Sequence, residues 1–232
     1  MTIIEPALVQ RLQPVTFNLY RDIHKGIRSE LFAVVAEAGR LDPSDDLGAA
    51  SLADQVRQVV QLLVDHAEHE DGTIQPALEL HAPMLAEQVA ADHHSLEDRM
   101  DWLVAVGSEA QSAGSRRAPL YELYMELAAF TGAYLAHQDF EERQVIQALE
   151  SAVGTEGVLG LHMQILGKMQ PQQLTSGLAV MFPAMNVDDR TELLFGTRAT
   201  APAEVFNGVW SLAKSVLSPD DSRAVAVRLG LA

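Results

Sequence analysis

The stretches His66-Ala-Glu-His-Glu70 and His137-Gln-Asp-Phe-Glu141 share one pattern, a histidine followed four residues later by a glutamate. Residues four apart on a helix lie on the same face. Each stretch therefore offers a neutral nitrogen and a carboxylate to one point, which is how helix bundles build two-metal carboxylate sites. Two further histidines, His24 and His93, stand where neighbouring helices would bring them to the same level.

The spacing of these residues predicts the topology. The midpoints between ligands on successive helices fall in the segments richest in turn-forming residues, at 41–48, 81–83 and 113–119. Because each residue of a helix adds a rise of ~1.5 Å, two helices that leave one turn climb by equal amounts. The ligands would then meet at one level. The pattern predicts an all-α fold, an up-down-up-down four-helix bundle.

The composition agrees with helices. Ala, Leu, Glu and Gln are abundant among the 232 residues, and alternation of β-branched and aromatic residues is nearly absent. Helices are expected at about 14–39, 51–72, 83–107 and 119–150. After Gly154 the chain reads as shorter helices broken near Pro171, Pro183, Pro202 and Pro219. We therefore expect a bundle over residues 1–153 and, over residues 154–232, a helical C-terminal extension packed on it.

The net charge and the absence of cysteine argue against several classes of partner and metal site. The net charge of −16 argues against nucleic acid and anionic membrane surfaces as partners. The start of the chain lacks a signal-peptide pattern and no apolar run approaches a spanning length, so a cytoplasmic protein is expected. With no cysteine in the chain, any metal must be held by His, Asp, Glu or Tyr, which are ligands of non-haem iron or manganese.

The chain resembles hemerythrin-like (HHE domain) proteins of the bacterial type with a helical C-terminal extension. The resemblance covers roughly residues 10–150 and rests on four motifs in order, which are Tyr20-Arg-Asp-Ile-His24-Lys-Gly-Ile-Arg28, Leu63-Val-Asp-His66-Ala-Glu-His-Glu70 with Pro76-Ala-Leu78, Ala91-Asp-His93-His-Ser-Leu96, and Tyr134-Leu-Ala-His137-Gln-Asp-Phe-Glu141-Glu142. It implies a non-haem di-iron centre with an oxo or hydroxo bridge. Members of such families bind oxygen, react with peroxide or nitric oxide, or sense iron or redox state.

The spacing and the resemblance together give a ligand set. One iron is expected on His24 and His66 and the other on His93 and His137, with two glutamates bridging them, Glu70 and Glu141. The resemblance leaves Glu142 as the alternative bridge, because oxygen carriers place this acid five residues after the histidine. His94 with Asp98 is the rival of His93, and Asp65 with His69 is a competing register on the second helix. Neighbouring acids are expected to orient the imidazoles: Asp65, Glu68 and Asp92.

Other residues near the expected site are not part of the expected ligand set. Glu97 stands where reversible oxygen carriers have another histidine, so the resemblance argues against reversible oxygen carriage and predicts a carboxylate-rich second iron. Tyr20 and Tyr134 lie one turn from ligands and are expected to pack in the core, although either could donate a hydrogen bond or bind iron. His81 is expected to be exposed at a turn. His162, in the extension, could lean over the site but is expected to be structural.

These expectations lead to two functions. The first is a di-iron oxidoreductase that binds and activates O₂ or H₂O₂, as an oxidase, oxygenase or catalase-like protein, with a possible small organic substrate under the extension. The alternative is a non-enzymatic protein that binds or senses O₂, NO or iron and uses the extension as its output surface. The replacement at Glu97 and the extra helices favour the enzyme.

Overall fold

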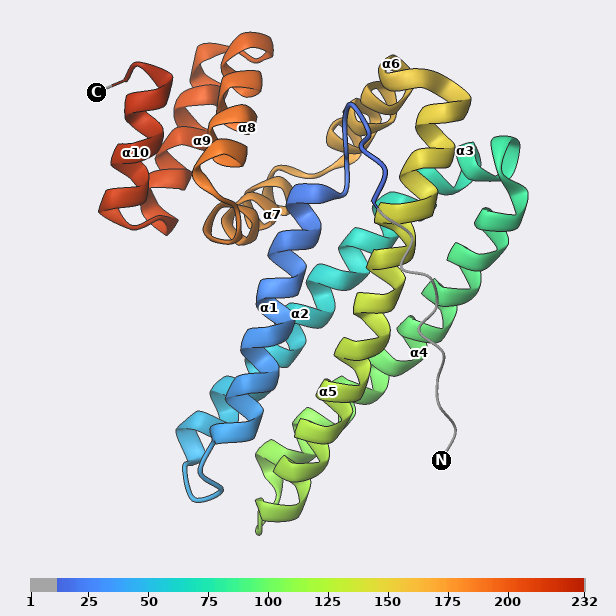
Figure 1. Cartoon of the computed structure of the whole chain (residues 1–232). Coiled ribbons are helices and arrows are strands. Elements are labelled where there is room, and N and C mark those ends of the chain that lie inside the picture. The colour runs from blue at the N-terminus through green and yellow to red at the C-terminus, as the bar shows by residue number, and fades with distance from the viewer. Residues whose placement is uncertain (1–11, 232) are drawn as a thin grey trace.

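The computed structural model describes residues 12–231, and these fold into helices (Figure 1). The first residues, on which the absence of a signal peptide was judged, lie outside the described part. The helices are α1 (Arg21–Arg40), α2 (Asp46–Asp71), α3 (Ile74–His81), α4 (Pro83–Ser112), α5 (Arg117–Phe140), the π-helix η1 (Glu141–Val145), α6 (Ile146–Lys168), α7 (Pro171–Ala184), α8 (Val187–Thr200), α9 (Ala203–Val216) and α10 (Pro219–Leu229). The expected all-α class is confirmed. No described helix is both long and apolar enough to cross a membrane.

Four long helices, α1, α2, α4 and α5, lie side by side, and each contacts two of the others (Figure 1). Their inward faces form one apolar core, to which each helix gives a stripe of buried residues such as Leu31, Leu63, Leu103 and Leu127. A second apolar cluster lies at the other end of these helices and contains Tyr20, Ile74, Val89 and Ile146, among others.

The polar residues of interest lie between these two clusters. Along α1 the order is Tyr20, then His24, then Ile27, so the histidine separates the second cluster from the main core. The same layering holds from α5 into η1, where Tyr134 of α5 belongs to the main core and Val145 of η1 to the second cluster, with His137 between them. Apolar residues therefore close the polar layer from both ends.

Two predicted helix starts are wrong. Helix α1 begins at Arg21 and not at Pro14, because side chains occupy the backbone N–H groups of Thr16 and Tyr20. Thr16 N donates to Glu150 Oε1 at 2.8 Å, and Tyr20 N donates to the Asn18 side chain at 3.0 Å. Helix α2 begins at Asp46 and not at Ser51. The carboxylate of Asp45 caps it by accepting from Gly48 N at 2.9 Å.

The other helix boundaries lie closer to their predicted positions. The third long helix begins at Pro83 as predicted, but the short helix α3 before it was not predicted. The fourth helix does not end at Glu150, because the chain continues into α6 with a kink at Gly154. There φ is +70°, which glycine adopts without strain. The expected unit boundary at 153/154 falls at this kink.

The C-terminal helices have their own apolar core, built around Phe182, Leu194 and Phe206. Helix α7 packs against α1. At one point of this contact, a Cβ added to Gly26 would lie 2.8 Å from Val180 Cγ1. The breaks predicted near the prolines agree with the structure, except that Pro183 lies within the last turn of α7.

Candidate metal centre

Glu70, near the end of α2, lies between two histidines. Its Oε1 atom is 3.3 Å from Nε2 of His66, one turn earlier on the same helix. Its Oε2 atom is 3.4 Å from Nε2 of His93, which α4 supplies. One carboxylate therefore presents each of its two oxygens to a different imidazole.

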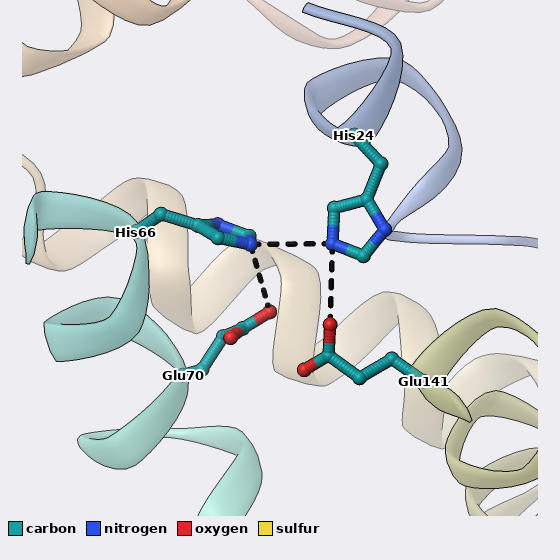
Figure 2. Close-up of side chains that lie close together, drawn as sticks. All are labelled: His24, His66, Glu70 and Glu141. Atoms are coloured by element: carbon teal, nitrogen blue, oxygen red, sulfur yellow. Dashed lines mark hydrogen bonds and ion pairs between the residues drawn. The ribbon is translucent and has the colours of Figure 1, made fainter. Parts of the chain in front are cut away.

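Glu141, at the junction of α5 and η1, repeats this arrangement. Its Oε1 atom is 3.3 Å from Nε2 of His137, and its Oε2 atom is 3.4 Å from Nε2 of His24. Figure 2 shows Glu141 and Glu70 facing each other across a gap that His24 and His66 border. The Nε2 atoms of these two histidines are 3.2 Å apart.

The six side chains form two overlapping groups. One contains His24 and His66, the other contains His93 and His137, and both groups contain the same two glutamates, Glu70 and Glu141. Within each group, one ligand atom per residue lies within 4.8 Å of all the others. Neighbouring ligands of an octahedral cation are about 3 Å apart when each bond is ~2.1 Å. The observed separations of 3.2–3.4 Å are close to that value.

The buried atoms of this layer support a cation between them. All six side chains are buried. Both oxygens of Glu70 and the Oε2 atom of Glu141 have no hydrogen-bond partner among the described residues. Carboxylate oxygens buried without a partner are costly, and metal coordination is one of the few arrangements that compensates them. The residues present therefore fit a bound metal.

Two carboxylates this close cannot ionise independently. Burial, followed by the charge of Glu141, raises the pKa of Glu70 to about 7. Burial also acts to raise the pKa of Glu141, but its hydrogen bond with His137 and the charges of the histidines outweigh burial and lower that pKa. Without metal, Glu70 is thus the carboxylate that holds a proton near neutral pH.

The pKa values of the imidazoles are also shifted in different directions. Burial lowers the pKa of His66 well below its usual value, and the nearby His24 adds to this effect. Burial acts in the same direction on His93, but its hydrogen bond to Asp71 and the negative charges of Glu70 and Asp71 outweigh burial and raise that pKa to about 10. A cation in the site would therefore have to displace protons from His93 and Glu70.

Three of the histidines have an acid at their outer nitrogen. Nδ1 of His24 lies 3.0 Å from Glu142, and Nδ1 of His93 lies 2.8 Å from Asp71. Nδ1 of His137 is 3.5 Å from Asp92, a separation without hydrogen-bond geometry. A carboxylate at Nδ1 fixes the tautomer in which Nε2 is free to bind a metal.

These contacts settle the expectations about orienting acids. Asp92 does lie near an imidazole, as predicted. Asp65 instead accepts a hydrogen bond from Gln61 Nε2 at 2.9 Å, and Glu68 is exposed. Sequence reasoning missed Asp71, and it treated Glu142 as a possible bridge. Glu142 lies outside both groups and also accepts from Arg28 Nη1 at 2.9 Å.

The rival histidines lie outside the two groups. His94 and Asp98 are exposed on α4, whereas His93 is buried. His69 is half-buried but is not among the grouped residues, and His81 is exposed at the end of α3 as predicted.

The expected role of Glu97 is wrong. Although it lies one turn after His93, its side chain is exposed and is not part of either group. An exposed acid on α4 adds no carboxylate to the buried layer, so Glu97 gives no support to the expected carboxylate-rich second iron.

The two tyrosines frame the site as core residues. Tyr20 stacks on His24 with ring centroids 5.0 Å apart, and Tyr134 contacts His137 at 5.9 Å. Burial, together with the charges of Glu70 and Glu141, raises the pKa of both phenols well above the usual value. His162 packs edge-on against Phe17 at 5.3 Å and lies outside both groups.

Comparison with known proteins agrees with this geometry. The model of the hemerythrin HHE cation binding domain matches residues 15–149. No curated protein and no solved structure matches the chain. The matched segment covers more than half of the chain and contains every residue of the two histidine–glutamate groups. The protein therefore belongs to the hemerythrin HHE cation-binding domain family.

Proposed function

We propose that the chain holds two iron ions between Glu70 and Glu141, within a hemerythrin-type up-down-up-down bundle of α1, α2, α4 and α5. His24 and His66 would bind one ion, His93 and His137 would bind the other, and both glutamates would bridge them. One observation carries this proposal. Each glutamate directs its two oxygens to histidines of different groups.

The chemistry of the ligand atoms favours iron. Imidazole nitrogens and carboxylate oxygens, with no cysteine in the chain, are the ligands of non-haem iron or manganese. Two octahedral ions share about twelve positions, of which four histidines and two bridging glutamates fill about eight. About four positions then remain for small exogenous ligands.

The activity supported best is reaction with O₂ or H₂O₂, as an oxidase or a peroxide-decomposing protein. When bound, a pair of ferrous ions would supply the electrons that reduce such molecules. The protein holds the Nε2 atoms in place through the outer acids, and its buried apolar clusters exclude bulk water from the layer. In an oxidase, a small organic substrate would serve as the electron donor.

Metal analysis of the protein loaded anaerobically with ferrous iron tests this function. We expect two irons per chain, and less than one in Glu70→Gln, because that change removes a charged bridge. Glu68→Gln, on an exposed position of the same helix, is the matched control and should keep both irons. The loaded protein should consume added H₂O₂. One zinc, or no metal, would refute the di-iron assignment.

A second function, binding or sensing of O₂, NO or iron, is favoured by two ion pairs of one residue, Asp189. The helix that carries His24 is tied to the C-terminal helices, since Lys25 and Arg21 both form ion pairs with Asp189 of α8. In that case residues 154–232 would be an extension that reports the state of the metal site. Tight NO or O₂ binding without peroxide turnover would favour this function over the enzyme.

A further inference from the structure

Gln138, the residue after His137, is fully buried, and its amide has no partner in the part of the chain that the structure describes. Neither Nε2 nor Oε1 forms a hydrogen bond with any described residue. A buried primary amide left in this condition carries a large desolvation cost. An amide that both donates and accepts is compensated by a small molecule that can do the same.

A second unpartnered group lies two turns away on the same helix. Thr131 is 6% exposed, and its Oγ1 atom also has no partner among the described residues. Residues 131 and 138 are seven apart and therefore share a face of α5. The rise along the helix between them is about 10 Å, which a few water-sized molecules span.

Thr131 also lines an open groove between α1 and α5. The groove has a volume of about 550 Å³, and its walls are mostly apolar, with Phe32, Val35 and Leu135 among them. Pockets of this size with a few placed polar groups are typical of small-molecule sites. Thr131 thus belongs to the wall of the groove, while its Oγ1 atom is buried behind that wall without a partner among the described residues.

The same face continues to the metal site. Glu142 lies four residues after Gln138, one turn further along the chain. It contacts Nδ1 of His24 at 3.0 Å, and Arg28 on α1 holds its carboxylate. Thr131, Gln138 and Glu142 therefore follow one another from the groove to the His24 side of the six ligands.

We propose that Thr131 and Gln138 form a buried polar route by which hydrogen peroxide passes from the groove between α1 and α5 to the His24 side of the metal site. Hydrogen peroxide is small and neutral, and it donates and accepts hydrogen bonds. Water shares this chemistry and would occupy the same route, whereas O₂ forms no such bonds and gains little from it. The inference rests on the proposed function, and it names the oxidant that the site receives.

The first arm of the test uses the metal-free protein. In Gln138→Leu and in the unchanged protein, NMR cross-relaxation between water and side-chain amide protons is compared. We expect a cross-peak between water and the Gln138 amide. Its loss in Gln138→Leu would assign the peak, and Thr131→Val should weaken it. A Gln138 amide that shows no contact with water would overturn the route.

The second arm compares oxidants. The ferrous protein is mixed with H₂O₂ or with O₂ in a stopped-flow instrument, after equal iron content is verified. Gln138→Leu and Thr131→Val should each slow the peroxide reaction about tenfold, the effect of losing one hydrogen bond to the passing molecule, and leave the O₂ reaction nearly unchanged. Gln75→Leu is the control. This glutamine also has an unpartnered oxygen but lines a different groove, between α3 and α4, and its replacement should change neither rate.

The outcomes are distinguishable. Unchanged peroxide rates in both variants, or equal losses with both oxidants, would overturn the route while leaving the proposed function intact. An unchanged protein that holds no iron, or that holds iron and does not react with peroxide, would overturn the proposed function and the peroxide route with it.

Discussion

Asp71 lies 2.8 Å from Nδ1 of His93 and accepts its hydrogen bond, while the preceding residue, Glu70, lies 3.4 Å from Nε2 of the same ring. Two consecutive acids at the end of α2 thus hold both nitrogens of one imidazole on α4. The inner acid belongs to the proposed metal ligands, and the outer acid orients the ring. This division of roles makes specific predictions.

The outer acid should tune metal affinity without contacting the metal. Asp71→Asn removes the charged acceptor at Nδ1, so the tautomer and orientation of His93 are held less firmly. We expect a loss of metal affinity of about 10–100-fold, measured by competition with a chelator. Asp65→Asn changes an acid bonded to Gln61 and serves as control. Equal losses in both variants would show that charge alone, and not contact with His93, causes the effect.

Metal binding should strengthen as the pH rises from about 6 to 8. A cation binds deprotonated ligands, and the metal-free site keeps protons on Glu70, whose pKa is about 7, and on His93, whose pKa is about 10. Raising the pH removes the Glu70 proton first and lowers the cost of binding. Calorimetry in buffers of different ionisation enthalpy should show protons released on binding. Affinity that is flat over this range, with no proton release, would contradict the arrangement.

Two histidines on the same helix should differ in their effect on metal binding, because their side chains point in different directions. His66→Ala should abolish metal binding, whereas His69→Ala should leave it nearly intact, because only His66 belongs to a group. The adjacent pair on α4 gives the same comparison, with loss in His93→Ala and none in His94→Ala. Iron content after purification is the measurement. Retention of iron in His93→Ala and its loss in His94→Ala would reverse the assignment on α4.

Packing between α1 and α7 should be sensitive at Gly26. In Gly26→Ala the new Cβ would lie 2.8 Å from Val180 Cγ1, with the backbone of Val180 at 3.3 Å. The neighbour is β-branched and stiff, so relief requires α7 to shift, at a cost of about 1–3 kcal/mol. Gly196→Ala, within α8 and with no atom nearby, should instead stabilise by about 1 kcal/mol. Thermal unfolding followed by circular dichroism measures both. A Gly26→Ala protein as stable as the parent would show that α7 can shift at this contact without a measurable loss of stability.

Helical spacing predicted which six side chains come together. The HxxxE pattern depends only on positions along one helix, and the turns near the midpoints brought four helices into register, so the expected six side chains converge in the structure. The partners at Nδ1 were harder to predict. Asp71 meets His93 across two helices, and which acid reaches which ring depends on helix rotation, which sequence does not display.

The errors in the sequence analysis have the same origin. Glu97 occupies the position one turn after His93, yet the rotation of α4 points it to solvent. Nothing in the sequence distinguished Gln138, whose buried and unpartnered amide is visible only in the structure. The start of α1 depended on Glu150, a residue more than a hundred positions away that takes the N–H of Thr16. A local sequence pattern does not predict contacts between residues that are far apart in the chain.

The central claim is that two irons lie between Glu70 and Glu141. Anomalous diffraction from crystals of the iron-loaded protein, collected above and below the iron absorption edge, tests it most directly. We predict two iron peaks about 3–4 Å apart, one nearest His24 and His66 and the other nearest His93 and His137. A single peak, a peak that persists below the iron edge, or iron located elsewhere on the chain would contradict the account.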